Sequence, residues 1–388
     1  MNIQQAKRMD MFEPSIFGTL KEVAVEKINA GEEVIDLSIG SPDLPPHEVI
    51  REKLAQFSRM PNMYGYTLGG TRRFHEAVAD YYKRRSNVDL HTEKEIIKTM
   101  GSQEGLVHLP LAFCDEGDIV LTTNPAYVAY DVGIQLAGAV PYEMPLLAEN
   151  DFLPKLSEVP EEIARKAKLL ILNLPGNPVP AMPTTEFFEE VIAFAKKYDV
   201  IVVHDAAYSE FYFEGDAPFS FLSIPGAKEV GIEVNSLSKS FSLAGARIAY
   251  IVGNEKVITI LRRLKSNLDY GTFEPIQEAA AVALDNAEQI TDALRKTFKK
   301  RHEVLTKGLQ KLGWTVTPSN GGMFVWAKYP YDIDANTFAI ETIRQVGVIV
   351  VPGSAFGSEG EGYARIALVQ NEARLAEAIK RLEALSFN

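Results

Sequence analysis

Four short runs rich in apolar and β-branched residues recur between residues 96 and 203, and they restrict the fold of this chain most. These runs span residues 96–99, 119–122, 169–172 and 200–203. Amphipathic patterns typical of helices precede or separate these runs, at residues 72–85, 103–113, 126–137 and 184–198. Apolar strands that alternate with helices are typical of a mostly parallel sheet covered on both faces. The sequence therefore predicts an α/β fold.

The pattern changes towards the C-terminus. Helices are predicted at residues 255–285, 287–312, 335–346 and 371–384, and short strands at 314–318, 323–328, 348–351 and 364–368. An N-terminal helix at 15–30 and a strand at 34–39 have too little apolar surface to stand alone, so we expect them to pack beside this tail. We predict a large domain at 46–285 and a smaller, discontinuous α+β domain made of 1–45 and 286–388.

Charge and cysteine content exclude several classes of function. The formal net charge of −12 over 388 residues argues against a basic face for nucleic acid. Cys114 is the only cysteine, so neither an intramolecular disulfide nor a cysteine-built metal cluster can form, and we predict no metal site. Residues 1–15 carry no apolar segment, and no run elsewhere is long enough to span a bilayer. We expect a soluble, cytoplasmic protein with no membrane contact.

The strongest chemical signal is a lysine in a segment of small residues. Lys239 follows Ser236 and Ser238, Arg247 comes eight positions later, and residues 230–235 are predicted to form a strand. A lysine amine can bond to the aldehyde of pyridoxal 5'-phosphate (PLP), while hydroxyls and a guanidinium hold its phosphate. We expect a loop after the strand to present Lys239 to a cleft. For this segment alone, an ordinary surface loop is the alternative.

Further polar residues follow predicted strands, where ligands of parallel sheets gather. Gly101, Ser102 and Gln103 begin a helix whose backbone N–H groups suit a phosphate, although a helix cap without a ligand has the same pattern. Asp205 follows another strand, and a buried carboxylate there needs a cationic partner such as the ring nitrogen of PLP. Tyr208 can then donate to the phenolic oxygen of the cofactor. Without a ligand, Asp205 would cap the next helix.

Three more residues complete the candidate site, each with a structural alternative. Asn177 can donate to the same phenolic oxygen, or form a simple turn with Pro178. Tyr127 can stack on the pyridine ring, or pack in the core. Arg365 lies within a short apolar strand and suits either the carboxylate of a substrate or an internal salt bridge.

Taken together, these segments resemble the class I/II aminotransferases, the PLP-dependent enzymes of fold type I, over nearly the whole chain. The stretch from Ser236 to Arg247 is similar to the family's cofactor-attachment signature. The resemblance implies a seven-stranded sheet in the large domain and an α-carboxylate site at Arg365, near the backbone of Gly40. It also implies roles for Asn177 at the substrate and for a set of catalytic and cofactor-binding residues. These residues are Gly101, Ser102, Gln103, Tyr127, Asn177, Asp205, Tyr208, Ser236, Ser238, Lys239 and Arg247.

The resemblance further implies a homodimer whose active sites are shared between the subunits. Tyr66 is similar to the tyrosine that reaches the phosphate of the neighbouring subunit's cofactor. Tyr64 competes for this role, because the spacing from Tyr66 to Gly70 is short.

The most similar branch contains the LL-diaminopimelate aminotransferases and the methionine-pathway aminotransferases. Two departures bear on substrate preference. The usual Asn-Pro-Thr-Gly turn is replaced by Asn177-Pro178-Val179-Pro180, and the usual Gly-Trp-Arg by Gly245-Ala246-Arg247.

The resemblance implies a ping-pong aminotransferase that moves an amino group from an L-amino acid to a 2-oxo acid through pyridoxamine phosphate. A PLP-dependent C–S β-lyase would use the same residues and stays an alternative. A PLP-sensing transcription factor would need a basic DNA-binding region, which the sequence does not show. A nicotinamide dehydrogenase would need a Gly-x-Gly-x-x-Gly turn after a first strand, which the sequence also does not show.

Substrate recognition is expected from segments 15–17, 270–273 and 320–324. These segments provide Phe17, Tyr270, Phe273 and Met323, which mildly favour methionine, an aromatic or an aliphatic amino acid over aspartate.

Overall fold

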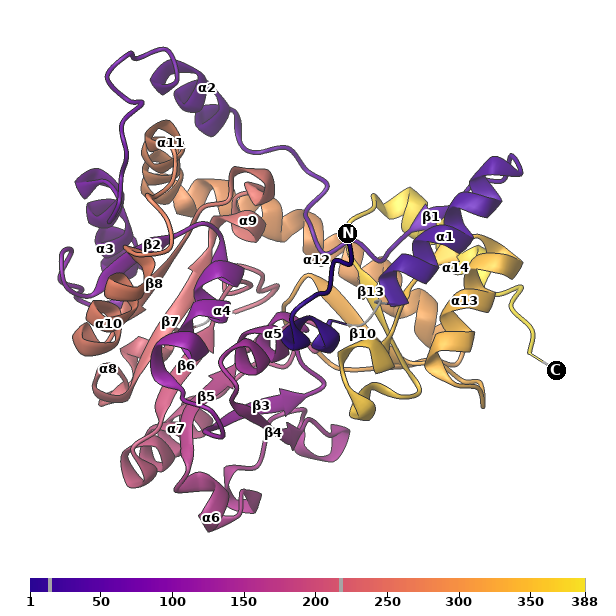
Figure 1. Cartoon of the computed structure of the whole chain (residues 1–388). Helices are drawn as coiled ribbons and strands as arrows, with labels where there is room; N and C mark the ends of the chain where they lie inside the picture. The colour runs from indigo at the N-terminus through magenta and orange to yellow at the C-terminus, as the bar shows by residue number, and fades with distance from the viewer. Residues whose placement is uncertain (13–15, 216–218, 388) are drawn as a thin grey trace.

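A seven-stranded sheet forms the centre of the larger part of the protein (Figure 1). The computed structural model describes residues 1–12, 16–215 and 219–387. Strands β3, β4, β5, β6 and β7 run parallel, whereas β8 is antiparallel to both of its neighbours, β2 and β7. The predicted α/β class with a mostly parallel, seven-stranded sheet is confirmed. The strand order is β2 (Ile96–Thr99), β8 (Ala249–Gly253), β7 (Gly231–Ser236), β6 (Ile201–Asp205), β5 (Ala167–Leu172), β3 (Ile119–Asn124), β4 (Val140–Pro145).

Helices cover both faces of this sheet. They are α2 (Glu48–Phe57), α3 (Arg72–Ser86), α4 (Ser102–Phe113), α5 (Ala129–Leu136), α6 (Glu161–Ala164), α7 (Thr185–Tyr198), α8 (Ala227–Val230), α9 (Leu237–Ser240), α10 (Glu255–Lys265) and α11 (Glu274–Asp285). Ile97 and Leu169 pack in one core with α4, α5 and α10, whereas Ile96 and Leu170 pack in another with α3, α7 and α11. Because successive strand residues point to opposite faces, both faces need apolar side chains.

Strands β4 and β8, helix α2 and the short helices α6, α8 and α9 of this part had no counterpart among the elements predicted from the sequence. Strand β4 lies at the edge of the sheet, and most of its residues are half-buried or exposed. It carries Pro141 and Pro145, which are tolerated at an edge but obscure the strand pattern. Within the described residues, no helix has the length and apolar character that crossing a membrane requires.

The N-terminal and C-terminal segments build a smaller unit with a core of its own. Its main sheet is antiparallel, and a two-stranded parallel sheet pairs Ile35 with Val348, which joins the two ends of the chain. The elements are α1 (Ile16–Asn29), β1 (Ile35–Asp36), α12 (Ala287–Lys311), β9 (Thr315–Val316), β10 (Phe324–Lys328), α13 (Ala335–Val346), β11 (Val348–Ile349), β12 (Val351–Pro352), β13 (Tyr363–Ala367) and α14 (Glu372–Leu382).

The structure corrects some details of this smaller unit. The strand expected at residues 34–39 is reduced to β1, and the one expected at 348–351 is divided into β11 and β12. The predicted domain boundaries stay predictions; they fall between β1 and α2 and between α11 and α12.

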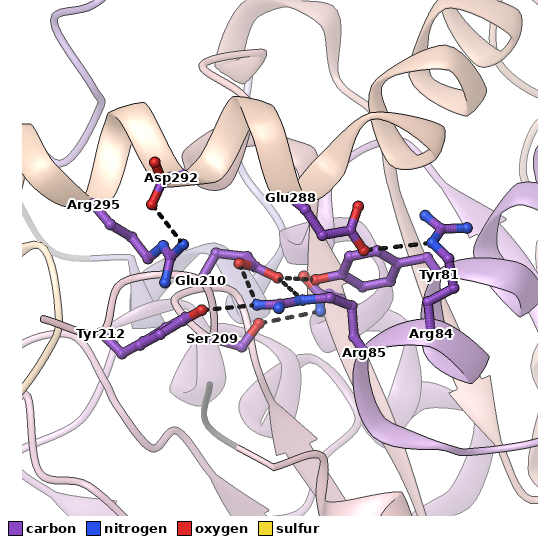
Figure 2. A network of polar contacts seen from close by, with 10 residues as sticks. Tyr81, Arg84, Arg85, Ser209, Glu210, Tyr212, Glu288, Asp292 and Arg295 are labelled. Carbon is purple, nitrogen blue, oxygen red and sulfur yellow. Dashed lines mark hydrogen bonds and ion pairs between the residues drawn. The ribbon is translucent and has the colours of Figure 1, made fainter. Parts of the chain in front are cut away.

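A buried polar network joins α3 to the segment after β6, beside the long helix α12 (Figure 2). Glu210 accepts hydrogen bonds from two of the Arg85 guanidinium nitrogens, Nε at 3.1 Å and Nη2 at 2.9 Å, and from the Tyr81 hydroxyl. The Arg295 guanidinium of α12 lies 4.1 Å from the centre of the Tyr212 ring. The network fixes the chain that follows β6, and hence the end of the strand that carries Asp205.

Replacing Glu210 by alanine should lower the free energy of unfolding by about 3 kcal/mol, because Arg85 and Tyr81 lose a buried partner. Glu288→Ala is the matched control, since it removes an ion pair with Arg84 in which the side chains are 49% and 39% exposed. Its effect should stay below about 1 kcal/mol. Urea unfolding followed by circular dichroism measures both variants, and equal losses would contradict the role of Glu210.

Candidate active site

A cavity of about 750 Å³ opens at the carboxyl ends of β5, β6 and β7 and extends to α1 and β13. Parallel strands bring the residues at their ends together at this edge of the sheet. Asn173 follows β5, Asp205 ends β6 and Lys239 follows β7, and all three line the cavity. Arg365 of β13 lines it from the smaller unit.

Lys239 lies in the one-turn helix α9, not in the loop expected from the sequence. The Ser236 hydroxyl caps this helix by accepting a hydrogen bond from the Ser238 backbone N–H at 3.1 Å. The Lys239 amine donates to the Gly40 carbonyl of the smaller unit. Burial, aided by the positive charges of Arg247 and Arg365, lowers the pKa of the Lys239 amine to about 8.

Asp205 is almost wholly buried, with 4% of its surface exposed. The Tyr130 hydroxyl donates to its carboxylate at 2.9 Å, and the Ala207 backbone N–H at 3.2 Å. Burial raises the pKa of Asp205 despite these hydrogen bonds. Within the described ranges, the carboxylate has no ion pair with an Arg, Lys or His side chain, so a cation entering the cavity would stabilise it.

Arg365 is equally buried and has no carboxylate partner among the described residues. Its Nη1 donates to Asn177 Oδ1 at 2.8 Å and its Nη2 to the Ser38 carbonyl, whereas the buried Nε has no partner in this part of the chain. The guanidinium carbon lies 4.4 Å from the Phe324 ring centre and 4.9 Å from that of Phe356. Burial lowers the pKa of Arg365 to about 10. The charge is therefore held in place but not neutralised.

The turn before α4 lies against Arg247. Gly101 has a φ of +85°, a backbone conformation that favours glycine, and a Cβ atom built on it would be 2.2 Å from Arg247 Nη2, so a side chain here would displace the Arg247 guanidinium. The backbone of Arg247 also adopts the left-handed conformation, with a φ of +53°, and the Arg247 Nη1 donates to the Ala244 carbonyl at 2.9 Å. The start of a helix and a guanidinium side by side form a site for an anion.

Most of the residues predicted for the site are brought together by the structure. The cavity lining contains Gly40, Ser102, Gln103, Tyr127, Asn177, Asp205, Tyr208, Ser238, Lys239, Arg247 and Arg365. Gly101 and Ser236 are buried and do not belong to this lining. Tyr66 lies outside the cavity, 85% exposed, with its ring centre 5.2 Å from that of Tyr270.

Of the four residues expected to contact the substrate side chain, one lines the cavity. Phe17 lines the cavity, whereas Tyr270 and Phe273 pack against Tyr66 and Tyr64. The expectation for Met323 is wrong, because its side chain is fully buried in the core of the smaller unit. Residues 13–15, at the start of the expected helix 15–30 and segment 15–17, lie outside the described residues.

Two residues that support Asp205 were missed in the sequence. Asn173 donates to the Asp205 carbonyl at 2.7 Å and accepts from the Asn177 N–H at 2.8 Å, so it joins two strand ends. Its position directly after β5 is the signal that would have identified it. Tyr130 lies on α5, one helical turn from Tyr127, and its ring packs at right angles to the Tyr127 ring at 5.7 Å. No sequence signal separates it from an ordinary core tyrosine.

The lowered pKa of Lys239 predicts early titration of its amine. In the protein purified free of vitamin B6, acetylation of Lys239 by limiting acetic anhydride should increase with a midpoint near pH 8, against about 10.4 for a free lysine derivative in the same tube. Peptide mass spectrometry measures the modified fraction. Arg365→Met should move the midpoint upward, because it removes a positive charge. A midpoint near that of the free derivative would contradict the assignment.

Comparisons with known proteins agree with this geometry. The family model "Aminotransferase class I and II" matches residues 32–382. LL-diaminopimelate aminotransferases from Moorella thermoacetica and Aquifex aeolicus are 40% and 41% identical over 381 residues, covering 98% of this chain and of each relative. The structure of substrate-bound BacF from Bacillus subtilis has a TM-score of 0.94 at 34% identity, over 99% of this chain and 98% of BacF. A double mutant of aspartate aminotransferase from Thermus thermophilus has a TM-score of 0.92 at 27% identity, over 98% and 99%. The chain belongs to the class I and II aminotransferases, enzymes that move an amino group between an amino acid and a 2-oxo acid.

Proposed function

We propose that this chain uses PLP, held in the cavity, to transfer the amino group of an L-amino acid to a 2-oxo acid in two half-reactions. One observation carries the proposal: a buried carboxylate and a lysine amine with a pKa of about 8 face the same cavity. The cofactor would satisfy both, through its ring nitrogen and its aldehyde.

The residues around the cavity fit PLP in charge. Asp205 would accept a hydrogen bond from the protonated ring nitrogen, which supplies the cation that its burial requires. The phosphate would be held by Arg247, Ser238 and the first turn of α4. Gly101 precedes this turn, and the absence of a side chain there lets the Arg247 guanidinium lie against it. When bound, PLP supplies an aldehyde that carries the amino group and a ring that takes up the electron pair released at the substrate α-carbon.

Other residues around the cavity have complementary roles in the proposal. Asn177 Oδ1 already accepts from Arg365, so its NH2 group is left to donate to the phenolic oxygen, together with the Tyr208 hydroxyl. Tyr127 would pack on the ring, held by Tyr130 behind it. The Val179 carbonyl accepts from the Gly176 N–H at 3.0 Å, so the turn at Asn177 closes without the threonine of related enzymes.

Lys239 and Arg365 would act on the substrate directly. Arg365, whose guanidinium lies against the Phe324 and Phe356 rings, would hold the α-carboxylate beside the backbone of Gly40. The Lys239 amine would remove the proton at the α-carbon and return one to the acceptor. Its pKa of about 8 leaves about a tenth of the amine as free base at pH 7, far more than an ordinary lysine with a pKa of about 10.4 would have.

We also infer a cytoplasmic homodimer in which Tyr66 reaches the cofactor phosphate of the neighbouring subunit. The Tyr64 hydroxyl donates to the Ser58 carbonyl of its own chain at 2.7 Å, whereas Tyr66 is the more exposed of the two and does not line its own cavity. Tyr66 is therefore the better candidate of the two. Sedimentation equilibrium tests the inference, and a fully active monomer would contradict it.

Stopped-flow absorbance tests the proposed reaction. With PLP bound, an amino donor should abolish the cofactor absorbance band, a 2-oxo acid should restore it, and one oxo acid should form per site. The donor panel should include LL-diaminopimelate, which the names of the relatives suggest. Lys239→Ala should slow the first half-reaction at least about a hundredfold, because the general base is lost.

Lys27→Ala is the control, since Lys27 pairs with Glu32 and does not line the cavity. It should leave both half-reactions unchanged. Release of ammonia without any need for a second oxo acid would instead indicate a β-lyase, and a complete lack of spectral change across the panel would exclude the proposal.

A further inference from the structure

One cation of the cavity has no role in the proposed chemistry. Within the described residues, the cationic side chains of the lining are Lys21, Lys239, Arg247 and Arg365. The proposed function uses the last three for the α-carbon proton, the phosphate and the α-carboxylate. Lys21, on α1, is left over.

Lys21 belongs to a face of α1 that is otherwise apolar. The residues of α1 that line the cavity recur every three or four positions, as neighbours on one face of a helix do. They are Phe17, Leu20, Lys21, Ala24, Val25 and Ile28. Val34, Ile39 and Ile349 continue this apolar surface on the adjacent segments. An apolar side chain of a substrate would therefore find apolar contacts here, and a charged one would find a single cation.

The charge of Lys21 is not neutralised within the part of the chain that the structure describes, where no ion pair of Lys21 occurs. Asp36 is one of two acidic residues in the lining, and its Oδ1 accepts from the Ser38 backbone N–H at 2.8 Å and hydroxyl at 2.6 Å. The other lining carboxylate, Asp205, is buried and accepts a hydrogen bond from the Tyr130 hydroxyl. Lys27 of the same helix differs, since it pairs with Glu32.

We propose that Lys21 binds the distal carboxylate of a dicarboxylic substrate whose α-carboxylate lies on Arg365. This inference rests on the proposed function, in which one cavity must accept two substrates in turn. When the other substrate carries an apolar side chain, that side chain covers the apolar face of α1. The flexible, exposed Lys21 then turns to solvent. The substrate classes are thus an apolar amino acid and a dicarboxylic 2-oxo acid or its amino acid.

A pair of inhibitors isolates the contribution of Lys21 without turnover. Glutarate and pentanoate have the same carbon chain and differ by one carboxylate. Calorimetric titration of the PLP-loaded protein should show tighter binding of glutarate. Lys21→Met should weaken glutarate about five- to tenfold, the range of an exposed or partly exposed ionic hydrogen bond, and leave pentanoate unchanged.

Lys27→Met is the matched control, because it removes the same charge from the same helix away from the cavity. It should change the binding of neither acid. Equal weakening of both acids by Lys21→Met, the same glutarate loss in Lys27→Met, or no preference of the wild type for glutarate would each overturn the role of Lys21.

Half-reactions separate this inference from the proposed function. Lys21→Met should slow the half-reaction with glutamate about five- to tenfold in kcat/KM and leave that with methionine or leucine within twofold. A wild type that reacts with no amino acid would refute the proposed function. A wild type that reacts with both classes, together with a Lys21→Met variant that slows neither or both alike, would refute only the role of Lys21.

Discussion

The burial of Asp205 is the constraint on which the rest of the site depends. A carboxylate with only 4% of its surface exposed loses most of its hydration, and two hydrogen bonds from Tyr130 and Ala207 do not replace a counter-charge. Arg365 presents the same situation with the opposite sign. Each charge is held rigidly by neutral donors, acceptors or aromatic rings, and each faces the cavity. The protein thus keeps two uncompensated charges in place for groups that enter from outside.

The fold places these charges by a simple geometric rule. Three neighbouring parallel strands end at one edge of the sheet, and Asn173, Asp205 and Lys239 come at or just after those ends. The smaller unit adds Arg365 and the face of α1 from the other side. The hydrogen bonds from Lys239 to Gly40 and from Arg365 to Asn177 both join the larger part to the smaller one. The site is therefore complete only when the two parts are in contact.

The sequence was sufficient for much of this site because its signals are local. Lys239, Asp205 and the turn at Gly101 each follow a recognisable strand, so the position of the site at this edge of the sheet could be predicted from the sequence. The helix α9 was mistaken for a loop, because a single turn capped by Ser236 has no periodic pattern to read. Strand β4 was missed because its edge position tolerates proline.

What the sequence could not show depends on distant contacts. Met323 was expected near the substrate because it is apolar and lies in segment 320–324, which was assigned to substrate recognition, yet its side chain is buried in the core of the smaller unit. The sequence around Tyr130 does not distinguish it from an ordinary core tyrosine, and only the structure shows the hydrogen bond from its hydroxyl to Asp205. Lys21 is one of two lysines of its helix, and what separates it from Lys27 is that it lines the cavity and has no ion pair among the described residues.

Two lysines with a lowered pKa make the central claim testable in a single measurement. Burial lowers the pKa of Lys98 to about 8, as it does for Lys239, but Lys98 donates to Thr272 Oγ1 at 2.9 Å and does not line the cavity. The PLP-loaded protein can be reduced with borohydride, digested and analysed by peptide mass spectrometry. The account predicts the phosphopyridoxyl group on Lys239 and none on Lys98. A label on Lys98 or any other lysine, or no label at all, would contradict it.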